Sequence, residues 1–255
     1  MIDLIVDEVD VYAEFGVYIT EGGMNDLMSF PPLKEPEKVS WAERDGVEVD
    51  LSNPKLDAKR FSIDFAVTGN GDYNGFLAFI MTDGYHIFTF TSLGITKTLR
   101  VVAFPDLSVD LITTFKVEFS EDNPVRQFAS VGVGANTDYK LDNKDLSAYG
   151  IAVLQGSDDS ILKLPDLKPN LTINSRFENG VMYDAERVRY NEKQVSLKCL
   201  ALASTAFAFL NNMNAFLYAL TASGEREFTF KNLKYACYYK SMSVTNFDYS
   251  GRIWC

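Results

Sequence analysis

Hydrophobic and polar residues alternate in several short segments of the chain, which is the pattern of a strand with one buried face. The clearest case is residues 61–67 (FSIDFAV), where every second residue is large and apolar. Residues 195–199 (VSLKC) alternate in the same way and place Cys199 on the inward side. We therefore predict a strand in each segment and a buried, structural thiol at Cys199.

Two segments have the periodicity of a helix. Asp72 can cap a helix over residues 73–81, and Ser204 or Thr205 can cap a longer one that ends near Leu220. The longer segment carries one apolar stripe at the spacing i, i+4, i+7 and i+11, formed by Phe209, Met213, Phe216 and Leu220. A stripe of this kind is typical of core packing and not of a cofactor site.

Turn residues divide the remaining segments. Asp45-Gly46 and Asn179-Gly180 are dipeptides favoured in two-residue hairpin turns, because both central positions need a positive φ. They predict that residues 39–44 pair with 47–51, and that residues 171–178 pair with 181–183. The prolines of the loops Phe30-Pro31-Pro32 and Leu164-Pro165 exclude central strands there. Further strands are predicted at residues 14–20, 85–91, 98–104, 108–119, 148–154, 227–231, 235–243 and 247–255.

The same order of elements occurs twice. When the chain is aligned with itself at an offset of 134, several turn and strand residues fall on identical residues, and after a longer segment the offset becomes 140. The matches include Gly16 with Gly150, Pro31 with Pro165, Lys34 with Lys168, Asp50 with Asp184, Lys59 with Lys193, Phe76-Leu77 with Phe216-Leu217, and Phe88-Thr89-Phe90 with Phe228-Thr229-Phe230. They predict an internal duplication; the alternative is two unrelated β-rich halves with similar turns.

These patterns predict a mainly β chain with one helix per domain, an α+β protein made of two tandem, similar β-sandwich or half-barrel domains. The first domain covers residues 1–119 and the second covers residues 147–255. Residues 120–146 are rich in Pro, Gly, Asn and Asp, and we interpret them as an extended linker.

The charge is distributed unevenly between the halves. The chain has 24 Lys and Arg residues against 35 Asp and Glu residues, a net charge of −11. Residues 1–130 carry 10 basic and 22 acidic residues, whereas residues 131–255 carry 14 and 13. Binding to nucleic acid without sequence preference needs clustered Lys and Arg, which the acidic half lacks. An acidic surface would instead repel DNA.

The residue pattern predicts no catalytic residue, no cofactor and no metal site, and so a protein that is not an enzyme. His86 is the only histidine, and no serine elbow, HExxH, CxxC or P-loop accompanies it. Gly132-Val133-Gly134 lacks the third glycine of a dinucleotide loop. Asp158-Asp159 is interpreted as a solvated turn and not as a calcium loop.

The three cysteines, Cys199, Cys237 and Cys255, have no metal-like spacing, and we predict reduced buried thiols at the first two. The first residues show no signal-peptide pattern. The longest apolar stretch, residues 199–210, is too short to cross a bilayer. We expect a soluble protein without membrane insertion.

A domain of strands, a hairpin with Asp-Gly or Asn-Gly, one helix and closing strands, used twice in tandem, resembles the tail-tube fold of long-tailed bacteriophages. The residues that carry the resemblance are Asp45-Gly46, Asn179-Gly180, the two prolyl loops and the helices at 72–81 and 204–220. Tail-tube proteins, distal tail proteins and baseplate hubs share that fold. The resemblance implies a structural component of a phage or prophage tail or baseplate.

It further implies self-association into a ring of three or six copies around a central channel, contacts with other tail proteins, and DNA only as passing cargo. The location would be the tail of the virion, assembled in the bacterial cytoplasm. The nearly neutral second half departs from the expectation of an acidic channel. The alternative is a tandem β-sandwich that binds carbohydrate or acts in adhesion, for which Trp41 or Trp254 would stack on a sugar ring. A hydrolase ranks last.

Overall fold

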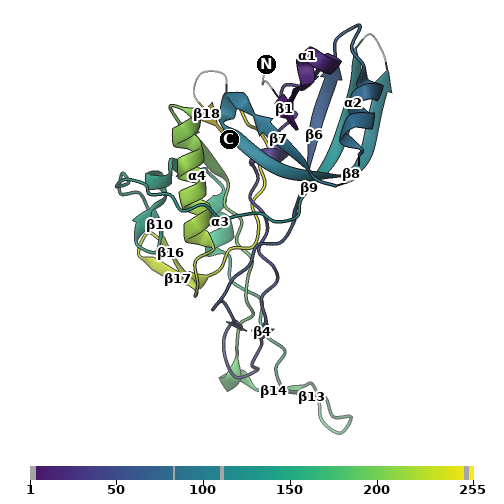
Figure 1. Cartoon of the computed structure of the whole chain (residues 1–255). Helices are drawn as coiled ribbons and strands as arrows, with labels where there is room; N and C mark the ends of the chain where they lie inside the picture. Colours follow the sequence, from purple (N-terminus) through teal and green to yellow (C-terminus); the bar gives the residue numbers. More distant parts are fainter. Residues whose placement is uncertain (1–3, 83, 110–111, 250–252) are drawn as a thin grey trace.

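The computed structural model describes residues 4–82, 84–109, 112–249 and 253–255. Residues 110–111 and 250–252, which fall in two predicted strands, lie outside this description. Figure 1 shows two bodies and a long arm to which both halves of the chain contribute. The described residues are mainly β with four α-helices, so the predicted α+β class is confirmed at that level. None of the helices described is long and apolar enough to span a membrane.

The first half forms a seven-stranded antiparallel sheet in the order β2-β1-β7-β8-β9-β6-β3, which curls into a half-barrel (Figure 1). Its strands are β1 (Leu4–Val6), β2 (Val9–Asp10), β3 (Val17–Ile19), β6 (Lys59–Val67), β7 (His86–Phe90), β8 (Ile95–Val109) and β9 (Thr113–Glu121).

The core of the half-barrel follows from the alternation in β6. Its apolar residues are buried and its Ser and Asp residues are half-buried, as predicted. Helix α2 (Tyr73–Ile80) covers the concave face and places Phe76, which is fully buried, 5.4 Å from the ring of Phe65. The N–H of Gly75 donates to Asp72 Oδ1 at 2.8 Å, which confirms the predicted N-cap.

The second half is built around α4 (Ala206–Leu220), which Thr205 caps through the N–H of Ala208 at 3.1 Å. Two smaller sheets flank this helix, in the orders β11-β10-β16-β17 and β12-β15-β18. Their strands are β10 (Tyr139–Leu141), β11 (Lys144–Asp145), β12 (Ile151–Val153), β15 (Cys199–Ala203), β16 (Arg226–Phe230), β17 (Leu233–Cys237) and β18 (Ile253–Trp254). Each half also has a short helix that was not predicted: α1 (Val11–Phe15) and α3 (Ser157–Leu162).

The strand pairing of the first half recurs in the second half. Val17 lies opposite Val67 in the first half, and their counterparts Ile151 and Ala201 lie opposite each other in the second half. The three residue pairs between β1 and β7 also recur, between β10 and β16. The first of them, Leu4 with Phe90, corresponds to Tyr139 with Phe230. The assignment of two tail-tube-type domains to residues 1–119 and 147–255 stays a prediction.

The predicted linker needs correction, because residues 139–145 form β10 and β11 of the second half. These strands are joined by a two-residue turn whose residues, Asp142 and Asn143, both have positive φ. Asp7 and Glu8 make the same turn between β1 and β2. The Asn and Asp content that indicated a linker is therefore the content of a tight hairpin.

The two predicted Asp-Gly and Asn-Gly hairpin turns are wrong. Strand β4 (Lys38–Val39) pairs with β5 (Glu48–Val49), and β13 (Thr172–Ile173) pairs with β14 (Met182–Tyr183), so each connection has eight residues. Gly46 and Gly180 have positive φ, but the residues before them do not. A two-residue turn of this type needs a positive φ at both central residues. The strands therefore separate earlier, and each pair is joined by a long loop.

Several predicted strands are shorter, longer or shifted. Strand β8 is one long strand with bulges near Ala103, where two strands were predicted. Strand β15 begins at Cys199, and Ala201 is its buried residue, so Cys199 is exposed and the predicted buried thiol is wrong. Strand β17 ends at Cys237, because the next residues leave the sheet to cover the first half.

Lys59 on β6 is a charged residue inside the core. Its ammonium group donates to the carbonyl oxygen of Leu27 at 2.7 Å and lies 4.8 Å from the ring centre of Phe61. Burial, followed by the nearby charge of Lys97, lowers the pKa of Lys59 to about 7. Lys193, its counterpart in the second half, likewise donates to the carbonyl of Ile161. In each half, a lysine thus donates to a backbone carbonyl of a short helical segment, at Leu27 in the first half and at Ile161 of α3 in the second.

The pKa of Lys59 predicts a stability that rises with pH. Below pH 7 the side chain is charged in both states and the cost of burying the charge is fully present. Between pH 7 and the unfolded pKa the folded state binds fewer protons, so stability increases. Relative to that of Lys59→Met, the free energy of unfolding of the wild type should increase by roughly 2 kcal/mol from pH 7 to pH 9. Urea unfolding at several pH values measures this difference. If stability depends on pH in the same way in Lys59→Met and the wild type, the prediction is wrong. Lys198→Met, at an exposed lysine, is the control.

Candidate assembly site

The arm joins the two halves through a loop of the first half. We call residues 40–47, between β4 and β5, the first loop, and residues 174–181, between β13 and β14, the second loop. The N–H of Gly46 donates to the carbonyl of Tyr190 at 2.8 Å, and the N–H of Tyr190 donates to Asp45 Oδ1 at 2.9 Å. Arg189 Nε donates to the carbonyl of Glu43 at 2.7 Å. The first loop is therefore held on an edge of the second half.

Lys168 is the central residue of this contact. It is buried, and its ammonium group donates to Ser40 Oγ at 3.1 Å and to the carbonyls of Trp41 at 2.8 Å and Gly46 at 2.6 Å. A buried ammonium group is tolerated only when it is hydrogen-bonded. The three acceptors all come from the first loop, so Lys168 fixes the conformation of that loop.

A second contact covers the prolyl loop of the first half. The segment after β17 lies along residues 25–33, where Tyr239 Oη donates to the carbonyl of Pro31 at 3.0 Å and the N–H of Val244 donates to Ser29 Oγ at 3.0 Å. Phe30 is buried there, with its ring 6.2 Å from that of Phe216 on α4. These apolar and polar contacts give the two halves a continuous shared core.

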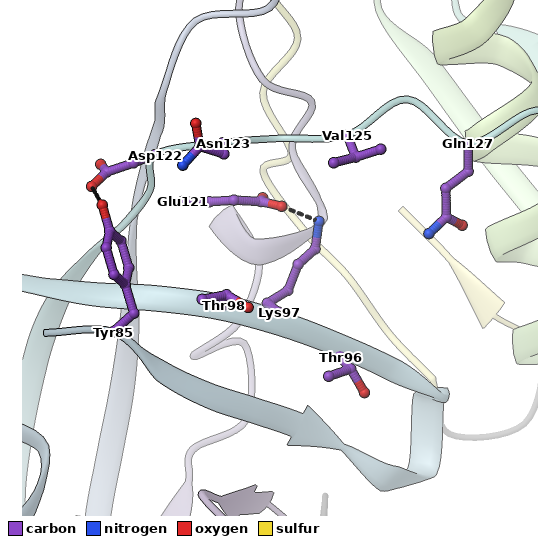
Figure 2. Close-up of a pocket in the computed structure, with 9 residues that line it drawn as sticks. All are labelled: Tyr85, Thr96, Lys97, Thr98, Glu121, Asp122, Asn123, Val125 and Gln127. Carbon is purple, nitrogen blue, oxygen red and sulfur yellow. Dashed lines mark hydrogen bonds and ion pairs between the residues drawn. The ribbon is translucent and has the colours of Figure 1, made fainter.

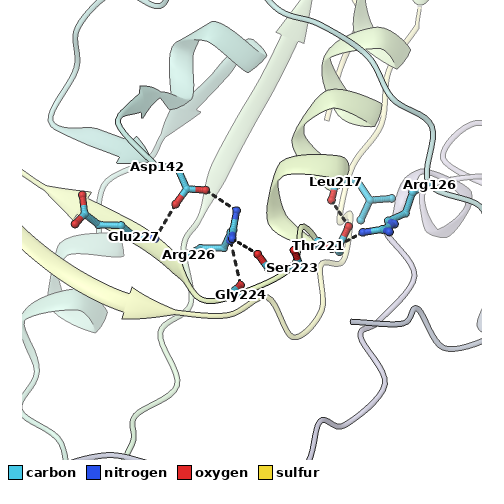
Figure 3. Close-up of polar contacts among 8 residues, drawn as sticks. All are labelled: Arg126, Asp142, Leu217, Thr221, Ser223, Gly224, Arg226 and Glu227. Carbon is cyan, nitrogen blue, oxygen red and sulfur yellow. Dashed lines mark hydrogen bonds and ion pairs between the residues drawn. The ribbon is translucent and has the colours of Figure 1, made fainter. Parts of the chain in front are cut away.

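The linker from β9 to β10 is fixed against α4. Arg126 donates to the carbonyl of Thr221 at the carboxyl end of that helix (Figure 3), and its guanidinium lies 5.7 Å from the ring centre of Tyr218. A cation is favourable at this end of a helix because of the helix dipole. The linker is thus a packed part of the second half.

His86, the only histidine, has a structural role. Its Nδ1 lies 2.5 Å from Asp7 Oδ2, and the N–H of Ile87 donates to Asp7 Oδ1 at 2.8 Å. Burial tends to raise the pKa of Asp7, but these two contacts outweigh it, and the pKa lies below its usual value. In the second half, Asp142 makes the same pair of contacts with Arg226 and the N–H of Glu227 (Figure 3).

Figure 2 shows a cleft beside β8, in whose wall Tyr85 contacts Asp122 and Lys97 contacts Glu121. Asp122 accepts hydrogen bonds from Tyr85 Oη at 2.8 Å, Arg100 Nε at 2.9 Å and Ser120 Oγ at 2.5 Å. The hydrogen bond from Arg100, followed by those from Ser120 and Tyr85, holds the pKa of Asp122 far below its usual value. The network fastens the start of the linker to the half-barrel.

The other residues singled out in the sequence are dispersed. Gly132 and Gly134 lie in the linker, Asp158 and Asp159 are in the first turn of α3, and Trp254 is in β18. Cys199, Cys237 and Cys255 are free thiols. Among the described residues, no cluster of three His, Cys, Asp or Glu side chains could hold a metal ion. The sequence matched Lys168 with Lys34 but gave neither residue a role.

The molecule exposes more surface than a compact protein of its size. Its accessible surface is 15376 Å². A compact monomer of this mass exposes about 11,000 Å². Large apolar side chains on the arm are part of the excess, namely Val39, Trp41, Leu164, Leu167, Leu171, Ile173, Phe177, Val181, Met182 and Tyr183. Such exposed apolar surface is typical of a chain that binds other proteins.

Comparisons with known proteins return little for this chain. No protein-family model matches it, and no curated protein matches it. Among solved structures, the SPP1 Dit (gp 19.1) protein matches with 10% sequence identity and a TM-score of 0.36, over 100% of this chain and 97% of the other. That protein is described as a paradigm of the hub adsorption apparatus in phages that infect Gram-positive bacteria. At this TM-score and identity the likeness assigns neither fold nor function.

Replacement of Lys168 should loosen the first loop. In Lys168→Ala the three acceptor oxygens lose their donor, which costs about 2 kcal/mol locally and raises amide exchange at Gly46 and Tyr190 by roughly 30-fold. Hydrogen exchange measured by mass spectrometry or NMR tests this. Lys163→Ala, at the exposed lysine directly after α3, is the control. Unchanged protection of Gly46 in Lys168→Ala would show that the ammonium group does not hold the loop.

Proposed function

We propose that the chain is a non-catalytic structural component of the tail or baseplate of a long-tailed phage or prophage, and that copies of it assemble into a ring around a central channel. The observation that carries the proposal is the contact of the first loop with the second half. The two halves share strand pairs, but the contact uses a loop of one half and a strand edge of the other. A head-to-tail interface likewise joins two different surfaces.

The excess surface and the apolar arm support assembly with further chains. An isolated arm of this kind exposes apolar side chains to water at a cost, which a neighbouring subunit removes. Two similar halves per chain would let three copies present six similar units, and six copies present twelve. Other tail proteins would then bind the two faces of the ring.

The charge distribution supports DNA as passing cargo. The first half has 12 more acidic than basic residues, and the second half has one more basic than acidic residue. A channel lined by the first half would repel the phosphates of DNA and keep it from adhering.

Light scattering of the purified chain over a range of concentrations tests the ring. We expect a mass of three or six copies, and negative-stain electron microscopy should show rings with a central opening. The apolar arm and the excess surface are the reasons for this expectation. A chain that stays monomeric at the highest concentration reached, with no rings in the images, overturns the proposal.

A carbohydrate-binding function is the second candidate, because of the surroundings of Trp41. Its ring is half-exposed on the first loop, and Glu43, Arg44 and Glu48 line a shallow depression beside it. An exposed indole next to carboxylates and a guanidinium suits a sugar, which needs an apolar face and hydrogen-bonding groups. Trp41 Nε1 already donates to Glu48 Oε2 at 2.8 Å, which orients the ring.

A glycan array tests this candidate. Binding to a defined class of glycan by the wild type, lost in Trp41→Ala, would favour it over the ring. We expect no such binding, since the indole and Glu48 satisfy each other. Trp254→Ala, at a half-buried indole in β18, is the matched control.

A further inference from the structure

The contact between the two halves is not reciprocated within the chain. The first loop docks on the edge of the second half formed by Lys168, Arg189 and Tyr190. The second loop, its counterpart in the second half, makes its hydrogen bonds within its own hairpin, among the residues that the structure describes. A two-fold relation between the halves would have produced both contacts, so the relation is head-to-tail.

The second loop nevertheless has the conformation of the first loop. Both loops have eight residues between paired strands in the same register. The N–H of Arg44 donates to the carbonyl of Trp41 at 3.4 Å, and the N–H of Glu178 donates to that of Ser175 at 3.3 Å. Gly46 and Gly180 both have positive φ. The second loop is therefore already shaped for the contact that the first loop makes.

The receiving edge also has a counterpart, which lies in the first half. The N–H of Lys168 donates to the carbonyl of Arg189 at 2.7 Å, and the N–H of Lys34 donates to that of Lys55 at 2.8 Å. Leu56 corresponds to Tyr190, and it pairs with Leu33 as Tyr190 pairs with Leu167.

This second edge is unoccupied. Lys34 is exposed, and its ammonium group has no hydrogen bond or ion pair within the described part of the chain. The N–H and C=O of Leu56 likewise have no partner among the described residues. At the first edge, the corresponding groups of Lys168 and Tyr190 all bind the first loop. The donors and acceptors needed for a second docking event are thus present and free.

Apolar residues show the same asymmetry. Met28 and Phe30 are each 7% exposed beneath the second half, whereas their counterparts Leu162 and Leu164 are 54% and 76% exposed. Leu33 is partly buried against the core, whereas its counterpart Leu167 is 52% exposed. The prolyl loop of the second half therefore keeps the apolar residues of a covered surface but lacks the cover.

We propose that the second loop of one copy docks on the Lys34–Leu56 edge of the next copy and repeats the contact made within each chain. Gly180 would donate to the carbonyl of Leu56, and the N–H of Leu56 would donate to Asn179 Oδ1. Lys34 would donate to the carbonyls of Ser175 and Gly180. This inference rests on the self-association in the proposed function, and it identifies the two surfaces that carry it.

Charge favours the same arrangement. In a head-to-tail assembly the acidic first half of each copy contacts only the nearly neutral second half of its neighbour. A symmetric contact between two first halves would bring together two surfaces with a large negative charge, which is unfavourable. A second copy of this chain is therefore the occupant that the free edge fits.

A disulfide test can detect the contact directly. Two variants are made in a background with the three native cysteines replaced by serine: Leu56→Cys in one chain and Asn179→Cys in another. Oxidation of the mixture should give a disulfide-linked dimer, and oxidation of either variant alone should not. The control is one chain with Asp45→Cys and Tyr190→Cys, the corresponding pair within a chain, which should form an intramolecular disulfide and no linked dimer.

A second measurement uses Lys34. In Lys34→Ala the fold should be unchanged, because this ammonium group has no partner in the described part of the chain. Assembly followed by light scattering should weaken about tenfold or more, as expected for loss of a charged hydrogen-bond donor. Lys198→Ala, at another exposed lysine, is the matched control and should assemble as the wild type does.

The outcomes separate this inference from the proposed function. A linked dimer in the mixture, together with weakened assembly of Lys34→Ala, supports the docking. Two results overturn the docking and leave the ring standing. One is that Lys34→Ala assembles as the wild type does. The other is that the protein assembles and the control pair forms its disulfide, but the mixture forms no linked dimer. A chain that stays monomeric and gives no linked dimer overturns both.

Discussion

The buried ammonium group of Lys168 is the interaction on which the arrangement of the two halves depends. A buried cation without a carboxylate is stable only if several dipoles solvate it, and the first loop supplies three oxygen atoms for this purpose. The loop must keep one conformation to do so. Asp45 and Gly46 of the same loop then pair with Tyr190, which anchors the arm to the second half.

Corresponding residues of the two halves lie in two different environments in this chain. Asp7 with His86 and Asp142 with Arg226 show how a structural contact is kept while the cation changes. Lys34 and Lys168 show the reverse, because the residue is kept while its surroundings differ. One lysine is solvated and the other is buried, and only the position of the neighbouring half separates them. An asymmetric pair of this kind leaves one free edge and one free loop in every copy.

Much of the local structure could be predicted, because it depends on neighbours in the sequence. The alternation in β6 and the caps Asp72 and Thr205 act over a few residues, and the structure has them where they were expected. The turn at Asp142-Asn143 has an equally local signal, but it was read as linker composition. The hairpin turns at Asp45-Gly46 and Asn179-Gly180 were predicted wrongly, because strand pairing further away decides where each loop begins.

The sequence by itself determined the mainly β class, the two capped helices and the correspondence between residues of the two halves, since periodicity and turn chemistry are properties of short segments. Only the tertiary structure decided which member of each corresponding pair is buried. Lys168 meets Gly46 across 122 positions of the chain, and no local pattern encodes such a contact. The candidate assembly site therefore emerged from the way in which two similar halves pack, which depends on their relative placement and not on either sequence segment alone.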